Sequence, residues 1–245
     1  NFGSFVLKEF PSHDILDRHY RESYYNGDHT NYSGEYSADE IDYFHFKDKI
    51  LDHFLSAEFP DIGNKLLDVG CGEGFTLKYF HERGWRCFGA DFSMQGIKNQ
   101  NPKLIDQIEF QQANIVTNSY FMDEVFDVIV GNGILEHVTD KEHVILDLHS
   151  KLRVGGCLFV LVPNDFGVIH RYYLENQKLE VGEAPWVVPM EHLTYFCASS
   201  LHKTLAEFGF EKVSILTDFP IEMFLLNNAT DFYTTDFGKV AHQIR

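Results

Sequence analysis

The feature that most constrains this chain is a turn with three alternate glycines at residues 68–74, which read D-V-G-C-G-E-G. The turn ends a short apolar run at residues 65–70, typical of a buried strand, and precedes a helical pattern at residues 75–83. Glycine adopts backbone angles that other residues avoid, and it lets a ligand approach the main chain closely. The sequence therefore predicts a ligand-binding loop between the carboxyl end of a strand and the amino end of a helix.

Strand-like and helix-like patterns alternate from residue 65 to residue 216. The expected strands are residues 65–70, 86–91, 108–114, 126–130, 157–162 and 213–216. The expected helices are residues 75–83 and 93–100, one that begins after Asp140, and one that begins after Ser199 or Ser200. Such alternation predicts an α/β fold with a doubly wound, mostly parallel sheet and helices on both faces.

The spacing of the glycines separates two kinds of cofactor loop. The dinucleotide fingerprint is G-x-G-x-x-G, whereas here the third glycine comes one residue earlier. This spacing, with Asp68 in front of it, resembles the S-adenosyl-L-methionine-binding loop of class I methyltransferases. Residues 126–138 (FDVIVGNGILEHV) and 189–196 (PMEHLTYF) also resemble this family, which includes the ubiquinone-biosynthesis O-methyltransferases. The resemblance covers about residues 60–216.

The resemblance implies a Rossmann-like, seven-stranded sheet and S-adenosyl-L-methionine as the cofactor. It also implies methyl transfer to a hydroxyl or amine of a small-molecule acceptor, such as a sugar, a natural product or a quinone-like compound. The expected domains are an aromatic-rich, helical N-terminal cap at residues 1–60 and a methyltransferase domain at residues 61–245. Within the second domain, residues 165–190 interrupt the alternation and are expected to form an insertion over the substrate cleft.

Side chains at the ends of the expected strands are the candidates for cofactor binding. Asp91 lies 23 residues after Asp68, close to the spacing of an acidic residue that accepts the ribose hydroxyls. Phe92 packs either on the adenine ring or in the core. Asn114 either bonds the adenine amino group, as the resemblance implies, or serves as a turn residue. The expected cofactor-binding residues are Asp68, Gly70, Cys71, Gly72, Asp91, Phe92, Asn114, Ile115, Gly131, Asn132 and Gly133.

Two histidines are candidates for the general base. The resemblance places His137 near the transferred methyl group and His192 on the substrate side of the cleft. A hydroxyl nucleophile needs a base to take its proton, whereas a neutral amine does not. A structural role explains each histidine equally well, so both interpretations stay open.

Aromatic and polar side chains are the candidates for acceptor binding. Tyr24 and Tyr25 lie in the aromatic-rich N-terminal segment, from which tyrosines could close over the cofactor. His170, Arg171 and Trp186 lie in the expected insertion, whose mixture of groups suits a sugar or an aromatic acceptor. The same segment suits a mobile lid or the contact of a homodimer equally well.

Charge and cysteine content argue against several other classes. Asp and Glu number 37 and Lys and Arg number 20, a net charge of −17 that disfavours nucleic acid as a partner. The four cysteines form no C-x-x-C pair, so no metal site is indicated, and reduced thiols are typical of a cytoplasmic protein. No apolar run reaches the about 18 residues that a membrane helix needs. We therefore expect a cytoplasmic protein without a membrane span.

Three other functions are compatible with a similar sheet. The glycine spacing argues against an NAD-dependent oxidoreductase. A catalytically inactive, adenosylmethionine-binding regulatory or interaction protein would keep the same loop and is the main alternative. An aminopropyltransferase-like enzyme would need an acidic polyamine pocket, which the sequence pattern does not reveal.

Overall fold

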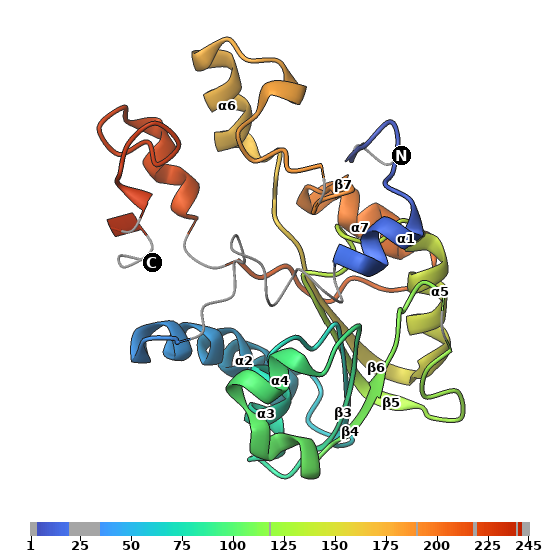
Figure 1. Ribbon diagram of the computed structural model, residues 1–245. Coiled ribbons are helices and arrows are strands. Elements are labelled where there is room, and N and C mark those ends of the chain that lie inside the picture. The colour runs from blue at the N-terminus through green and yellow to red at the C-terminus, as the bar shows by residue number, and fades with distance from the viewer. Residues whose placement is uncertain are drawn as a thin grey trace. The chain divides into compact units, whose positions relative to one another are not determined.

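The computed structural model describes residues 4–19, 35–117, 119–189, 191–217, 220–238 and 240–241 (Figure 1). The chain forms two compact units. Glu9–Val162 contains the main sheet and is called the sheet unit. Asn1–Lys8 and Pro163–Arg245 together form the second, called the C-terminal unit. Each unit has a hydrophobic core of its own.

The sheet unit is built on five parallel strands in the order β4-β3-β2-β5-β6. These are β2 (Lys65–Val69), β3 (Arg86–Asp91), β4 (Glu109–Gln112), β5 (Phe126–Asn132) and β6 (Leu152–Leu161). From the central β2 the chain moves outward to β3 and β4, and then returns to the other side of β2 for β5 and β6. Open parallel sheets bind ligands at such a reversal, beyond the carboxyl ends of the strands. The glycine turn follows β2 and therefore lies at the reversal.

Helices cover both faces of the sheet, with α2 and α3 on one side and α5 on the other (Figure 1). The core beside α2 combines Leu55 of that helix with Leu77 of α3 and Leu66 of β2. Burying a leucine side chain contributes about 1.5–3 kcal/mol, so these contacts join α2 firmly to the sheet. The helices of the unit are α1 (His13–Arg18), α2 (Ala38–Glu58), α3 (Phe75–His81), α4 (Gln95–Gln100), η2 (Pro102–Asp106) and α5 (Lys141–Lys151).

Side-chain caps determine where two of these helices begin. Ser37 Oγ accepts the Glu40 N–H at 3.3 Å, and Glu40 Oε2 accepts the Ser37 N–H at 2.8 Å, which forms a capping box before α2. Asp140 Oδ1 accepts the His143 N–H at 3.0 Å. The helix predicted after Asp140 is therefore confirmed, with its cap in place.

The C-terminal unit contains short elements around an aromatic core. Its strands β1 (Phe5–Val6) and β7 (Thr194–Tyr195) pair antiparallel. Its helices are α6 (Val168–Gln177), η3 (Val181–Glu183), α7 (Ala198–Glu207) and η4 (Ile221–Leu226). The core is formed by aromatic and aliphatic side chains that precede or follow α7 in the chain: Phe166, Tyr173, Leu174, Ala184, Trp186, Tyr195 and Leu225.

The structure corrects two of the predicted elements. No strand forms at residues 213–216, where Val213 and Ile215 are each 56% exposed. A strand needs a neighbouring strand for its hydrogen bonds, and local β-propensity does not supply one. The last helix begins after Cys197 rather than after Ser199 or Ser200, because Ser200 Oγ accepts the Cys197 N–H at 2.9 Å. Within the described residues the main sheet thus has five strands, not the expected seven.

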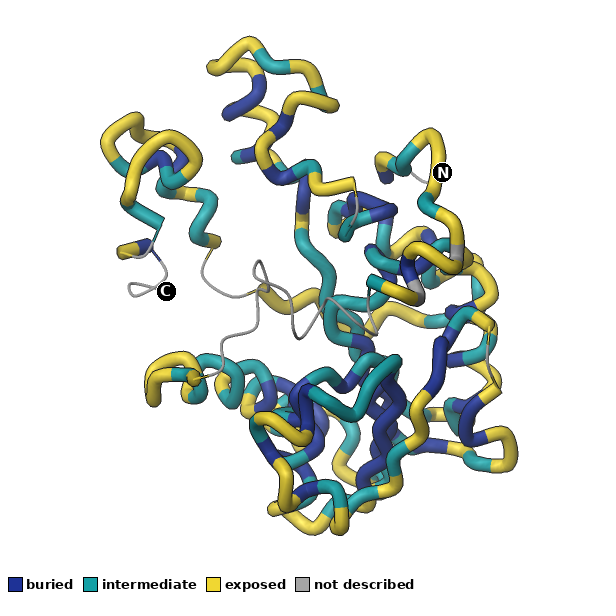
Figure 2. Tube along the Cα trace, viewed as in Figure 1, coloured by how far each residue is buried: buried dark blue, intermediate teal, exposed yellow. Residues whose placement is uncertain are grey.

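The compact units divide the chain after residues 8 and 162. Helix α2 shares the core of the sheet, and residues 165–190 belong to the same unit as the segments that follow them. The predicted domain boundaries stay predictions. Buried positions are concentrated along the strands of the sheet unit (Figure 2). Among the described residues, no helix has both the length and the apolar character needed to cross a membrane.

Candidate functional site

The glycine turn has the backbone conformation that its sequence predicts. Gly70, Gly72 and Gly74 have φ angles of 68°, 54° and 76°, a region that favours glycine. The Gly70 N–H donates to the Ala90 carbonyl of β3 at 2.7 Å. A Cβ on Gly70 would clash with the side chain of Ile134, which follows β5. The turn is therefore held closely between the ends of the neighbouring strands.

Asp91, the last residue of β3, connects two of these strand ends. Its Oδ2 accepts the Gly72 N–H at 2.9 Å, and its Oδ1 accepts the Ser93 N–H at 3.1 Å. Asp91 is only 8% exposed, and burial raises its pKa to about 6 although the backbone hydrogen bonds lower it. Each carboxylate oxygen has a further lone pair available for a ligand hydroxyl.

Glu73, between the second and third glycines, has a role that the sequence analysis did not assign. Tyr36 Oη donates to Glu73 Oε2 at 2.8 Å, and Asn101 Nδ2 donates to the Glu73 carbonyl at 2.8 Å. The Tyr36 ring meets Phe44 and Phe75 edge-on, at centroid distances of 5.1 and 5.8 Å. Burial raises the pKa of Glu73 to about 7, against the lowering effect of the Tyr36 hydrogen bond. The start of α2 is thereby connected to the turn.

Asp68 is a second buried carboxyl at the end of β2, 3% exposed. Burial raises the pKa of Asp68 well above its usual range, and nearby Asp48 and Asp91 raise it further. The Cys71 thiol is also buried, and its pKa is raised for the same reason. Both groups therefore lie in surroundings that disfavour a negative charge.

The ends of β4 and β5 lie along the same edge of the sheet. Asn114, 6% exposed, follows β4, and its Oδ1 accepts the Val116 N–H at 3.0 Å. This is the turn role that the sequence allowed for it. The Ala113 N–H donates to the Asp91 carbonyl at 2.8 Å, which joins the two strand ends. A Cβ on Gly131 in β5 would meet none of the described residues within 4 Å, so as far as these residues show there is open space beside this strand.

His137 lies in the turn that leaves β5. Gly133, with φ of 68°, donates its N–H to the Leu161 carbonyl of β6 at 2.9 Å. The His137 N–H then donates to the Ile134 carbonyl at 3.0 Å. His137 Nε2 lies 3.9 Å from Oε1 of Glu136, whose side chain is 2% exposed. A buried carboxylate thus accompanies this imidazole.

All eleven predicted cofactor-binding residues follow β2, β3, β4 and β5 on the sheet's carboxyl edge or form the last residues of those strands. His137 belongs to the same unit. His192, His170, Arg171 and Trp186 belong to the C-terminal unit. Tyr24 and Tyr25 lie outside the described residues.

The predicted residues of the C-terminal unit have structural contacts of their own. The Arg171 Nε–H donates to the Phe166 carbonyl at 3.0 Å. His170 is 7% exposed, and burial lowers its pKa to about 4, so it is neutral at pH 7. Burial also lowers the pKa of His192, whose ring lies 6.0 Å from that of Tyr195.

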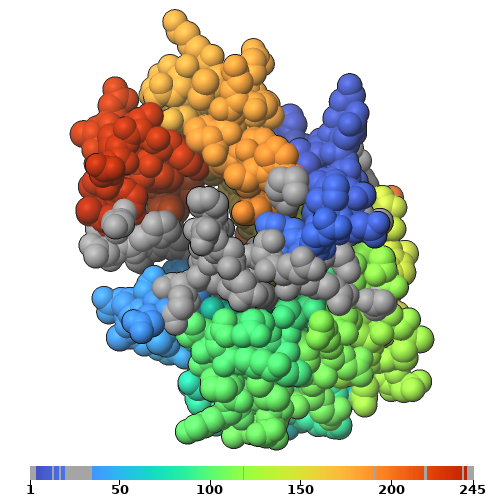
Figure 3. All heavy atoms as spheres, in the orientation of Figure 1, coloured from blue at the N-terminus to red at the C-terminus, as the bar shows by residue number. Residues whose placement is uncertain are grey.

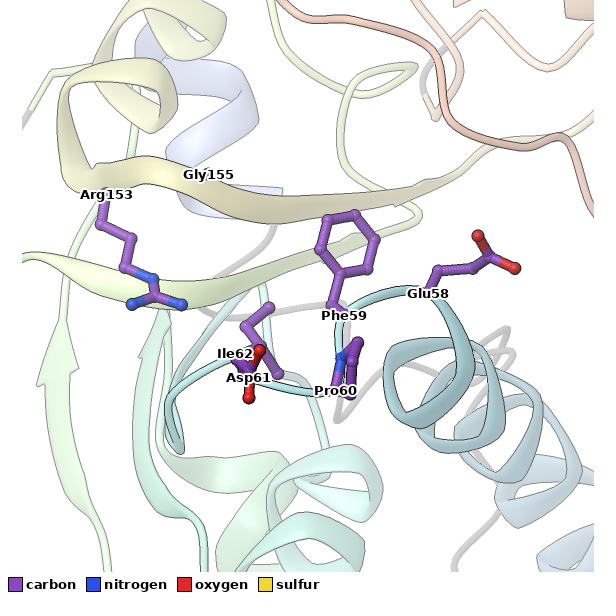
Figure 4. A pocket seen from close by; sticks show the side chains of 7 residues that line it. All are labelled: Glu58, Phe59, Pro60, Asp61, Ile62, Arg153 and Gly155. Atoms are coloured by element: carbon purple, nitrogen blue, oxygen red, sulfur yellow. The ribbon is translucent and has the colours of Figure 1, made fainter.

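A cavity of about 260 Å³ opens at the start of the sheet rather than at its carboxyl edge (Figure 4). Arg153, at the start of β6, lies at this cavity, and its Nε is 2.8 Å from Asp127 Oδ1. None of the predicted site residues lines the cavity, so we do not assign the cofactor to it. The lining residues are Glu58, Phe59, Pro60, Asp61, Ile62, Arg153 and Gly155.

The strand order, the early third glycine and the acid at the end of β3 define the class as that of the class I S-adenosylmethionine-dependent methyltransferases. A family model described as a methyltransferase domain matches residues 41–215. The chain belongs to this methyltransferase family.

Curated relatives match part of the chain. The ubiquinone biosynthesis O-methyltransferase of Idiomarina loihiensis is 33% identical over 105 residues, which are 42% of this chain and 43% of the relative. The human mitochondrial ubiquinone biosynthesis O-methyltransferase is 31% identical over 111 residues, which are 43% of this chain and 30% of that protein. The matched part is less than half the length of either relative.

Two solved structures share the fold. The magnesium protoporphyrin IX methyltransferase of Synechocystis PCC 6803 with bound SAH has a TM-score of 0.51 and 17% identity, and the match covers 73% of this chain and 80% of that one. The plantazolicin methyltransferase in complex with SAH has a TM-score of 0.50 and 17% identity, over 80% and 79%. The predicted Rossmann-like α/β fold is confirmed.

Proposed function

We propose that this chain is a methyltransferase that binds S-adenosyl-L-methionine at the carboxyl edge of the sheet and methylates a hydroxyl or amine of a small molecule. The observation that supports this most strongly is the Asp91 carboxylate, which is buried at the strand reversal and bonded to the glycine turn through Gly72. Family membership and the fold shared with SAH-bound methyltransferases support the same function.

The residues at this edge fit an adenosyl group. Open space beside Gly131 leaves room for a ligand against the main chain of β5. Asp91 would accept the ribose hydroxyls through its remaining lone pairs. Asn114 would bond the adenine amino group, and Ile115, 5% exposed, would supply apolar contact. The turn of Gly70 and Gly72 would contact the amino-acid part of the cofactor, because glycine permits close approach.

When bound, the cofactor supplies a methyl group on a positively charged sulfonium. The protein's main task is to hold the acceptor atom in line with this methyl group and to exclude water, and positioning alone can supply about 7–11 kcal/mol of the barrier. His137 would take the proton from an acceptor that carries one, and Glu136 at 3.9 Å would stabilise the resulting imidazolium. His192 stays the second candidate for the base.

Calorimetric titration of the purified protein tests the cofactor assignment directly. We expect micromolar binding of S-adenosylmethionine and S-adenosylhomocysteine and no binding of NAD. Asp91→Ala should weaken this binding. Asp106→Ala, at an exposed position in the same unit, is its matched control. Absence of binding by both methyl donor and product would contradict the proposal. Formation of S-adenosylhomocysteine with a panel of small hydroxyl and amine acceptors then distinguishes an enzyme from an inactive binding protein.

A further inference from the structure

The C-terminal unit contains a cluster of aromatic rings around Trp186, here called the Trp186 cluster. The Trp186 ring lies 4.5 Å from His170, 5.9 Å from Tyr173 and 6.0 Å from Tyr233, measured between centroids. Phe166 meets Trp186 at 5.9 Å. These residues come from segments that precede and follow α7 in the chain. In the space-filling view, the α6 segment (orange) lies near the segment that begins with η4 (red) (Figure 3).

Three carboxyl groups accompany these rings. Asp165 directly precedes Phe166 of the cluster in the chain, and Glu222 lies in η4, the helix that precedes Tyr233. Burial raises the pKa of the Tyr233 hydroxyl, and the charges of these two carboxyl groups and of Asp231 raise it further. Asp231 is bonded within the unit, because it accepts the Tyr173 Oη–H at 3.2 Å and the Tyr233 N–H at 2.9 Å. Among the described residues, no Lys, Arg or His forms an ion pair with any of the three carboxyl groups.

Two buried polar atoms of the cluster have no hydrogen-bond partner among the described residues. Asp165 is 5% exposed and its Oδ2 is unpaired, while Trp186 is 8% exposed and its Nε1–H is unpaired. Leaving a buried polar group unsatisfied costs about 1–3 kcal/mol, and such groups are rare in folded proteins. An acceptor and a donor are thus left unpaired beside aromatic rings, which is the composition of a ligand site.

The chemistry of these groups selects one class of ligand. An organic ammonium ion is attracted by the faces of Trp and Tyr rings and donates charge-assisted hydrogen bonds to a carboxylate. A neutral or anionic ligand would leave Asp165, Glu222 and Asp231 without a compensating charge. The net charge of −17 over the whole chain also favours a cation.

We propose that the Trp186 cluster binds an organic ammonium group, with Asp165 as its hydrogen-bond acceptor and the Trp186 N–H as the donor to a neighbouring polar atom of the same ligand. This binding site lies within the C-terminal unit and is independent of the function proposed above.

The chain contains two tryptophans, which permits a site-specific test. Trp85 belongs to the sheet unit and packs on Phe80 at 5.2 Å, so Trp85→Phe leaves Trp186 as the single tryptophan fluorophore. We would titrate this variant with glucosamine, putrescine and tert-butylamine, and with glucose, 1,4-butanediol and tert-butanol as neutral counterparts. We expect a saturable change of Trp186 fluorescence with at least one amine, and affinity at least tenfold weaker for its neutral counterpart. No saturable change with any amine, or an equal response to the neutral compounds, would overturn the inference.

A charge-removing variant tests the role of Asp165. Asp165→Asn should weaken binding of the responding amine at least tenfold, whereas Glu207→Gln, an exposed position at the end of α7, should leave it unchanged. If Asp165→Asn does not fold, the comparison of amines with neutral counterparts still decides the question. Calorimetry with S-adenosylmethionine separates the two proposals. Binding of the amine without adenosylmethionine would contradict only the methyltransferase proposal. Binding of adenosylmethionine without any amine would contradict only the ammonium site.

Discussion

Two buried acids, Asp91 of the sheet unit and Asp165 of the C-terminal unit, have opposite hydrogen-bonding surroundings. In the sheet unit, Asp91 is bonded by two backbone N–H groups, so its position is determined by the turn that it holds. In the C-terminal unit, Asp165 is equally buried, but its Oδ2 has no partner among the described residues. A site formed by the backbone of one turn can be recognised as a motif in the sequence. A site formed by side chains from distant segments has no such motif.

Substitution of the two candidate bases should give the largest loss of turnover. It tests which unit contains the residue that takes the proton from the acceptor. His137→Ala should lower turnover by about 10²-fold, because a positioned general base contributes roughly 10²–10⁴-fold. His192→Ala should lower it less, because burial lowers the pKa of His192 and makes it a weaker proton acceptor. Initial rates with saturating cofactor measure both variants. Loss of turnover in His192→Ala alone would move the base to the C-terminal unit.

Gly70→Ala tests how rigidly the turn depends on its backbone. The positive φ of 68° and the clash with Ile134 should lower the free energy of unfolding by about 2 kcal/mol. Gly84→Ala is the matched control, because its φ is 84° but an added Cβ would meet no atom of the residues that the structure describes within 4 Å. Thermal denaturation of both variants isolates the contribution of the clash. Equal losses would show that the turn tolerates the added carbon.

Asp91→Ala sharpens the comparison between the two buried acids. It should weaken S-adenosylmethionine binding at least tenfold, about 1.4 kcal/mol, and leave amine binding at the Trp186 cluster unchanged. Asp165→Asn should do the opposite. Calorimetry of both variants with both ligands measures the four affinities. A change of both affinities in either variant would contradict the assignment of one ligand to each unit.

The pH dependence of stability gives the smallest expected effect. Burial raises the pKa of Glu73 and of Asp165 to about 7, whereas unfolded carboxyls titrate near pH 4. The folded chain therefore holds more protons than the unfolded chain between about pH 4 and 7, so stability falls as the pH rises through this range. Glu73→Gln and Asp165→Asn should each make this fall smaller, because neither amide titrates. Melting temperatures at pH 5 and pH 8 check this, with the exposed Asp106→Asn as control.

The strands and helices of the sheet unit were predictable from the sequence because their patterns are local. The strand expected at residues 108–114 is β4 at Glu109–Gln112, and the helix expected at residues 75–83 is α3 at Phe75–His81. The strand predicted at residues 213–216 does not form, because this apolar segment has no neighbouring strand to pair with among the described residues. The Tyr36–Glu73 hydrogen bond was also not predicted, although an acidic residue between two glycines was a visible signal.

The sequence by itself determined the glycine turn, its position after a buried strand and the spacing to Asp91. These depend on φ angles and periodicities within a few neighbouring residues. Only the tertiary structure decided that α2 connects to the turn and that Tyr173 and Tyr233 approach the same tryptophan. Contacts between segments separated by tens of residues depend on packing, and packing is a property of the whole fold rather than of any short stretch.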